Sequence, residues 1–213
     1  MDQMKTLPEE IESIVTLIKS EIVWLHGHWR IFQQLYVGTP EIIDVLNKTA
    51  STYFYITREV LLNDIIISLV RLTDKKSTLG YQNISLDQII NCLDENQYPE
   101  LKAKLEEQLI TINELTKSLR NYRSKKLAHW DLEQALKIVE PLEVISLKMI
   151  NDVLEALGIF MNDLELFFLN SETAYEAFAM RSNGKTIITM LKKSLAYDKL
   201  ERQGVIEIGY WKR

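Results

Sequence analysis

The stretch PELKAKLEEQLITINELTKSLRNYRSKKLAHWD, residues 99–131, indicates the fold class of this chain. Proline suits the first turn of a helix, and the residues after Pro99 place apolar side chains at three- and four-residue intervals. These positions are Leu101, Leu105, Leu109, Ile112, Leu115, Leu119 and Tyr122. The stretch therefore predicts a long amphipathic helix. Lys126 and His129 occupy the next two core positions, so after Tyr122 the helix is expected to end, bend or turn this face away from the core.

The same helical period recurs through most of the chain, and only seven glycines and four prolines interrupt it. Further helices are predicted over about 8–37, 40–73, 85–94 and 142–169, with two more inside 171–213 that split at Asn183-Gly184. Ser85 and Gln88 have the spacing of a capping box. Residues 74–84 are predicted to form a loop, 132–140 are ambiguous, and 205–211 are typical of a strand.

These elements predict an all-α protein with two parts. Residues 1–170 are expected to form an antiparallel helical bundle, and residues 171–213 a C-terminal helical appendage and tail packed on that bundle. The single cysteine, Cys92, excludes an intramolecular disulfide and indicates a reducing, cytoplasmic setting. The apolar runs are too short or too interrupted by acids to cross a bilayer, so no membrane association is expected.

Positive charge is concentrated in one segment, although the net charge of the chain is −5. Between residues 117 and 126 there are five cations and no acid, namely Lys117, Arg120, Arg123, Lys125 and Lys126. Such a run can be a solvated helix face near a helix C-terminus, where cations suit the helix dipole. It can also be a phosphate-binding surface. The run alone leaves both interpretations open.

Few other residues suggest chemistry, because the chain contains none of the common nucleotide-binding, nucleophile or metal motifs. His26 and His28 are two positions apart, which points them to different faces of a helix and favours packing over a zinc site. Asp64 and Arg71 are seven positions apart in an apolar stretch, so they share one helix face. Since burying either charge alone is costly, each is expected to pair with the other or with a nearby group.

Arg123 and His129 together carry the groups that a minimal ribonuclease needs. An imidazole can move the proton of a ribose 2′-hydroxyl near neutral pH, and a guanidinium can clamp the phosphate as charge builds on it. On a straight helix six positions separate two side chains by about 120° and about 9 Å along the axis. The reach of arginine, a distorted helix end or a second protomer must therefore close the gap.

The strings 119-LRNYRSKKLAHWD-131 and 68-SLVRLTD-74 resemble the abortive phage-resistance branch of the HEPN superfamily, over roughly residues 10 to 170. Ribonucleases of that superfamily carry an arginine, usually a polar residue after it, and a histidine after a short gap, and Arg123, Ser124 and His129 match this pattern. The resemblance implies a dimeric α-helical bundle in which the arginine and histidine of both protomers face each other. It also implies RNA cleavage without a metal or any other cofactor.

Carried over residue by residue, the resemblance makes His129 the general acid and base and Arg123 the phosphate clamp. Asp64, Arg71, Ser124 and Asp131 would support this pair. The surrounding cations expected to bind RNA are Lys117, Arg120, Lys125 and Lys126. The leading hypothesis is a metal-independent endoribonuclease that acts as a toxin or phage-defence effector, with RNA as substrate, a homodimeric state and a possible antitoxin protein. The alternatives are a catalytically silent module that binds RNA, nucleotide or a protein partner, and a purely structural helical interaction protein.

Overall fold

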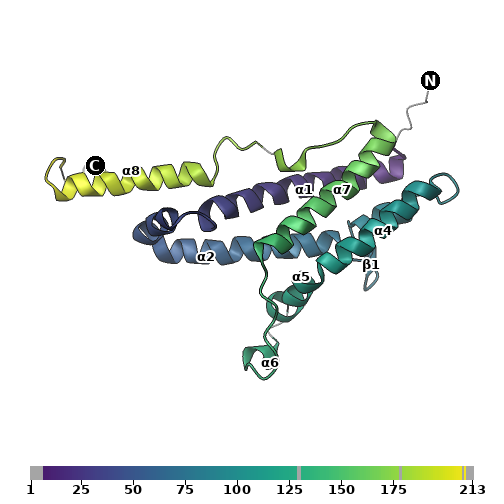
Figure 1. Ribbon diagram of the computed structural model, residues 1–213, viewed down its shortest axis with the longest axis horizontal. Helices are drawn as coiled ribbons and strands as arrows, with labels where there is room; N and C mark the ends of the chain where they lie inside the picture. Colours follow the sequence, from purple (N-terminus) through teal and green to yellow (C-terminus); the bar gives the residue numbers. More distant parts are fainter. Residues whose placement is uncertain (1–6, 129–130, 178, 208, 210–213) are drawn as a thin grey trace. The chain divides into compact units, whose positions relative to one another are not determined.

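A computed structural model describes residues 7–128, 131–177, 179–207 and 209. It is 73% helical, which confirms the predicted all-α fold (Figure 1). The described part of the chain contains a two-stranded antiparallel sheet, β1 (Ser77–Thr78) and β2 (Tyr81–Gln82), and eight α-helices. The helices are α1 (Glu9–Tyr36), α2 (Pro40–Leu72), α3 (Leu86–Cys92), α4 (Pro99–Leu115), α5 (Lys117–Tyr122), α6 (Leu132–Ala135), α7 (Leu147–Leu169) and α8 (Gly184–Arg202).

The two longest helices, α1 and α2, begin and end close to where the sequence predicts them. Three acidic residues occupy the first turn of α1, where they face the positive end of the helix dipole. Pro40 opens α2 in the turn that tolerates proline. The backbone of α2 departs from helical geometry at Ala50, so this helix consists of two pieces joined at a kink.

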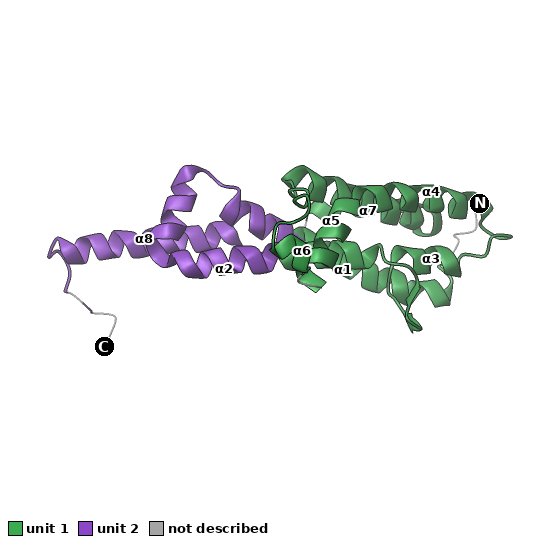
Figure 2. Ribbon diagram, turned by 90° about the horizontal axis from the view of Figure 1, so that it is seen from below, with its two compact units in different colours: residues 1–26, 63–178 green, residues 27–62, 179–213 purple. Residues whose placement is uncertain are grey.

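The chain divides into two compact units, which Figure 2 colours separately. Unit 1 contains residues 1–26 and 63–178, and unit 2 contains residues 27–62 and 179–213. The division falls inside α1 and α2, so each of these helices contributes to both units. Compact units reflect contacts within the chain, whereas domains are units of independent folding. The division into 1–170 and 171–213 therefore stays a prediction.

The core of unit 1 is built mainly by α7 against its neighbours. Its buried apolar residues keep helical spacing, and they are Ile150, Val153, Leu154, Leu157, Phe160, Met161, Leu164 and Phe168. Asp163 on α7 makes the polar contacts to α4. It lies 2.7 Å from the Lys104 ammonium and accepts a hydrogen bond of 2.5 Å from Gln108. Apolar burial and these polar contacts together hold the two helices side by side.

Unit 2 has a smaller core, formed by residues of α1, α2 and α8. Leu35, Leu46, Phe54 and Ile188 are buried together in it. The salt bridge between Lys192 and Glu41, at 2.6 Å, adds a polar contact between α8 and α2. The start of α8 is thus fixed against the two long helices.

Several predicted boundaries are wrong, each for a local reason. The helix expected from residue 142 begins at Leu147, because Ser146 caps it by accepting a hydrogen bond from the Met149 amide. Between 171 and 207 the described residues form one α-helix, α8, and a short 3-10 turn at Tyr175–Ala177 rather than two helices. Ser85 does precede α3, but its side chain makes no capping hydrogen bond, so the predicted capping box is absent.

The smaller predicted elements have mixed outcomes. The loop at 74–84 contains the short hairpin of β1 and β2. The ambiguous segment 132–140 holds α6 and then leaves helical geometry. Residues 205–207 of the expected strand-like tail are not in a strand, and most of the remainder lies outside the described residues. None of the described helices is both long and apolar enough to span a membrane.

Candidate functional site

The basic run of residues 117–126 spans the point where an α-helix continues as a π-helix. After α5 ends at Tyr122, residues Arg123–Ala128 continue as a π-helix. A π-helix makes i→i+5 hydrogen bonds, so it widens the turn and shifts the faces on which side chains lie. This explains why the apolar pattern is lost at Lys126, which is exposed together with Ser124 and Lys125. Such insertions occur frequently at functional sites.

Both arginines of this segment bind one carboxylate. Arg120 Nη1 donates to Asp74 Oδ1 at 2.6 Å, and Arg123 Nη1 donates to Asp74 Oδ2 at 2.9 Å. Arg120 Nη2 also donates to the Thr73 hydroxyl at 2.8 Å and to the Thr73 carbonyl at 3.2 Å. Thr73 and Asp74 directly follow the last residue of α2. We call these four residues, Thr73, Asp74, Arg120 and Arg123, the arginine cluster.

The arginine cluster is partly buried and carries positive charge. The side chains of Arg120, Arg123 and Asp74 are 32%, 26% and 24% exposed, so their ion pairs are less screened than surface pairs. One carboxylate between two guanidinium groups leaves an excess of one positive charge. A guanidinium has five N–H donors, and the Asp74 contact shown for Arg123 uses one of them. Asp74 therefore fixes the direction of Arg123 while leaving its other donors for an anion.

The structure describes most of the predicted site residues around this cluster. His129 lies outside the described residues. Lys117 and Lys125 are exposed, and Lys126 donates to the Tyr122 hydroxyl at 2.7 Å with its ammonium 4.7 Å from the centre of that ring. Arg120, which is predicted to bind RNA, contacts Thr73 and Asp74.

Asp131 acts as the N-cap of α6. Its Oδ1 accepts a hydrogen bond of 3.0 Å from the Gln134 amide, and its own amide donates to the Lys125 carbonyl at 3.2 Å. Asp131 thus closes the turn that follows the π-helix. Its predicted contact with His129 falls on a residue outside the described part of the chain.

Asp64 and Arg71 differ from the sequence interpretation in burial, whereas Arg71 does pair with a nearby group as expected. Both are exposed on α2, so neither is the buried charge that the apolar surroundings predicted. The ion pair that the structure shows for Arg71 is with Glu21 on α1, at 2.5 Å. The carboxylate that supports Arg123 is Asp74, ten positions after Asp64. Neighbouring residues of α2, such as Ile65 and Leu69, are buried.

A second polar network, which the sequence did not suggest, lies in the core of unit 1. Glu165 on α7 is 1% exposed, 2.7 Å from the Lys19 ammonium, and accepts hydrogen bonds from the Thr173 hydroxyl at 2.7 Å and the Tyr175 hydroxyl at 3.1 Å. Burial, together with the nearby Glu165 carboxylate, raises the pKa of Tyr175 well above its usual value. This network ties the segment after α7 to the helical core.

The two histidines of α1 are possible metal ligands by residue type. Within the ranges that the structure describes, no three His, Cys, Asp or Glu side chains are grouped so that they could hold a metal ion. His26 and His28 are partly buried residues of α1, beside the buried ring of Trp29.

The fold and the arginine cluster define an all-α protein with a cationic site at a helix end. A family model described as AbiU2, of the HEPN group, matches residues 8–187. The chain belongs to this HEPN-like abortive-infection family, which confirms the predicted membership. The match extends past residue 170 to include the start of α8. A comparison with curated proteins found no match, and a comparison with solved structures also found none.

Proposed function

We propose that this HEPN-like abortive-infection protein is a metal-independent endoribonuclease. The observation that carries the proposal is the ion pair between Asp74 and Arg123. It orients the Arg123 guanidinium within a partly buried, positively charged cluster and uses only one of its N–H donors in that contact. A phosphate that gains negative charge during cleavage is stabilised by donors that are already oriented. His129, six residues further on, supplies the imidazole.

The proposed reaction is an internal transesterification. The His129 imidazole accepts the proton of a ribose 2′-hydroxyl, and the 2′-oxygen attacks the adjacent phosphorus. The bond from phosphorus to the 5′-oxygen of the next nucleotide breaks, and that oxygen takes up a proton from an imidazolium. The products are a 2′,3′-cyclic phosphate and a 5′-hydroxyl. Arg123 stabilises the charge on the non-bridging oxygens, and the exposed Lys117 and Lys125 attract the RNA backbone.

Further parts of the proposal concern the state in which the protein acts. A homodimer would bring two copies of Arg123 and His129 to one site and so complete a site that is sparse in a single chain. An antitoxin protein would restrain the activity in the cytoplasm.

An RNA-cleavage assay on the purified full chain tests the proposal. Cleavage is expected with and without a chelator, and Arg123→Ala is expected to lose it. The matched control is Arg58→Ala, which removes a half-exposed arginine of unit 2 beside Glu59 and is expected to cleave normally. Cleavage that stops when the chelator is added would contradict the mechanism.

The second candidate is a catalytically silent module that binds RNA, nucleotide or a protein partner. The same ion pair supports it, because an arginine held by a carboxylate also occurs as a purely structural contact. RNA binding without cleavage by the wild-type protein would favour this candidate.

A further inference from the structure

A β-hairpin between α2 and α3 leaves apolar side chains in solvent (Figure 1). Leu79 is 94% exposed, Tyr81 is 78% exposed and Ile84 is 50% exposed. The residues of the strands β1 and β2 are exposed as well. We call residues 75–84, which the structure describes throughout, the α2–α3 hairpin. Packing within unit 1 does not explain why apolar side chains occupy its tip.

The turn of the α2–α3 hairpin holds a leucine in a backbone conformation that leucine disfavours. Leu79 has a φ of 51° and Gly80 has a φ of 85°, and two successive positive φ angles are typical of a tight two-residue hairpin turn. Glycine and asparagine suit such positions, whereas the Cβ atom of a bulkier residue crowds the following carbonyl oxygen. Leu79 weakens the turn and buries nothing, which points to a contact with another molecule.

Hydrogen bonds at the base of the α2–α3 hairpin fix its shape. Asn83 Nδ2 donates to the Lys75 carbonyl at 2.7 Å and to the Thr78 hydroxyl at 2.8 Å. The Lys76 amide donates to Asp87 Oδ2 on α3 at 2.7 Å. A tip that is already held in place loses little conformational entropy when it binds a partner.

The α2–α3 hairpin begins directly after the arginine cluster. Lys75, its first residue, follows Asp74, which binds both arginines of that cluster. Four residues of extended chain span at most about 14 Å, so Thr78 Cα lies within this distance of Asp74 Cα. Tyr81 pairs with Thr78 across the two strands, which adds about 5 Å. The Tyr81 Cα atom is therefore within about 20 Å of Asp74, a distance that a short single strand of RNA can bridge.

The charge of the α2–α3 hairpin favours an anionic partner. Residues 75–86 contain two cations, Lys75 and Lys76, and no acid, and both lysines are exposed. The two flanking acids already bind protein groups, since Asp74 binds the arginines and Asp87 binds the Lys76 amide. A partner that carries both negative charge and flat apolar groups fits this surface. Single-stranded RNA has both, because its phosphates are charged and its unpaired bases stack on aromatic side chains.

We propose that the α2–α3 hairpin binds an unpaired base of an RNA strand whose phosphates lie at the arginine cluster. The Tyr81 ring stacks on the base, and Leu79 packs against its apolar surface. The inference rests on the proposed ribonuclease function and deepens it, because it assigns single-stranded RNA as the substrate class. Tyr81 is then a positioning residue, since a base held at a fixed place determines which phosphodiester reaches Arg123.

Fluorescence anisotropy with RNA analogues that cannot be cleaved tests the stacking contact. The probes are a 2′-O-methyl RNA hexamer, whose 2′-oxygens are blocked, and a hexamer of the same backbone without bases. Tyr81→Ala is expected to bind the first probe about tenfold more weakly than the wild-type protein, because it loses one base stacked on an aromatic ring. Its affinity for the probe without bases is expected to be unchanged, because both proteins carry the same charges. Tyr81→Phe keeps the ring and is expected to bind both probes as the wild-type protein does.

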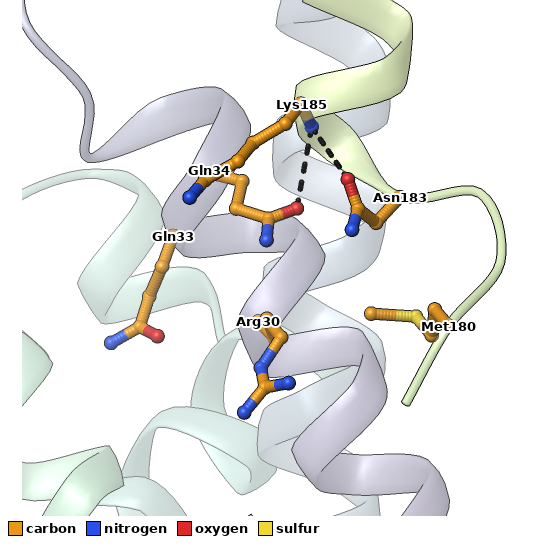
Figure 3. Close-up of a pocket in the computed structure, with 6 residues that line it drawn as sticks. All are labelled: Arg30, Gln33, Gln34, Met180, Asn183 and Lys185. Atoms are coloured by element: carbon orange, nitrogen blue, oxygen red, sulfur yellow. Dashed lines mark hydrogen bonds between the residues drawn. The ribbon is translucent and has the colours of Figure 1, made fainter. Parts of the chain in front are cut away.

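Control variants separate stacking from general effects on binding. Tyr55→Ala removes a tyrosine of unit 2 that is 65% exposed, and it is expected to leave both affinities unchanged. Lys75→Ala is expected to weaken binding of both probes in a salt-dependent way, because it removes a charge. Its control is Lys185→Ala, which removes an exposed lysine of unit 2 and is expected to change neither affinity. Figure 3 shows Lys185 beside Gln34 and Asn183 at the start of α8.

Leu79→Asn gives a second readout that does not depend on Tyr81. Asparagine tolerates a positive φ, so this variant is expected to have a higher Tm than the wild-type protein. It is also expected to bind the hexamer with bases more weakly, because the apolar contact is lost. A higher Tm with unchanged affinity would overturn the contact assigned to Leu79.

Unchanged hexamer binding by Tyr81→Ala, or equal losses for the probes with and without bases, would overturn the proposal. If Tyr81→Ala binds both probes normally but no longer gives the wild-type mass in light scattering, the hairpin contacts protein and the proposal is also overturned. Base-dependent binding by a wild-type protein that cleaves no RNA would overturn the ribonuclease function alone. Cleavage by the wild-type protein together with unchanged binding by Tyr81→Ala would overturn the role of the hairpin alone.

Discussion

The substitution Asp74→Asn tests the arginine cluster most sharply, because it keeps the size of the side chain and removes its charge. In the wild-type protein the Asp74 oxygens bind Arg120 at 2.6 Å and Arg123 at 2.9 Å, and all three side chains are one quarter to one third exposed. A hydrogen bond between charged groups contributes about 1.5–3 kcal/mol, and exposed ion pairs contribute less than about 1 kcal/mol. This partly buried pair of contacts lies between those limits. We therefore expect the free energy of unfolding to fall by about 2 kcal/mol.

For a chain of this size, about 2 kcal/mol lowers the Tm by about 4–8 °C. The matched control is Asp152→Asn, which disrupts a single i,i+4 pair with the strongly exposed Lys148 and should cost about 0.3–0.5 kcal/mol. Thermal unfolding followed by circular dichroism compares the two variants. If both shift the Tm equally, the Asp74 contacts do not stabilise the fold as inferred.

The same substitution separates positioning of Arg123 from simple charge attraction. Without the carboxylate, Arg123 loses its fixed direction, so RNA cleavage should fall. RNA affinity should hold or increase, because the cluster gains one positive charge. Cleavage at the wild-type rate in the Asp74→Asn protein would refute the positioning role.

Three further predictions concern pH-dependent stability, RNA binding and the oligomeric state. Tyr175 has a raised pKa, so above about pH 10 the unfolded state releases this proton before the folded state does, and the free energy of unfolding falls as the pH rises further. Urea unfolding at several pH values should show a shallower fall for Tyr175→Phe than for the wild-type protein. Equal slopes of stability against pH would contradict the burial argument. Lys125→Ala should weaken RNA binding and reduce the slope of log affinity against log salt by about 1, which a salt titration of fluorescence anisotropy measures. Light scattering at micromolar concentration should give the mass of a dimer, and a monomer would exclude a site shared between protomers.

Local sequence patterns were enough to predict most of the fold. The apolar spacing and the prolines located α1, α2 and α4 closely, because these long helices bury one continuous face. The start of α7 was missed because Pro141 is also a good helix opener, whereas the capping contacts of Ser146 decide where the helix begins. The segment before α8 was misjudged as helix because its order depends on Glu165, which binds Thr173 and Tyr175 from another element.

The candidate site was only partly accessible from the sequence. The loss of the apolar period after Tyr122 indicated that the helix changes at this point, where the structure has a π-helix. The basic run indicated the positive charge of the site. The family resemblance implied Asp64 as a supporting acid, whereas the spacing along α2 indicated only that Asp64 and Arg71 share a helix face. The actual partner of Arg123 is Asp74, 49 positions earlier in the chain, and pairing over that distance is set by tertiary packing. The position of Asp74 directly after the end of α2 was the sequence feature that could have suggested it as the partner of Arg123.

The most direct test of the central claim is analysis of the RNA products made by the wild-type protein, by His129→Ala and by Arg123→Ala, each with excess chelator. The account predicts that the wild-type protein releases fragments ending in 2′,3′-cyclic phosphates whether or not the chelator is present. It predicts that His129→Ala folds normally and still binds RNA but releases no fragments, and that Arg123→Ala loses both cleavage and part of its affinity. A folded His129→Ala protein that cleaves at the wild-type rate, or wild-type products with 3′-hydroxyl ends, would contradict the mechanism.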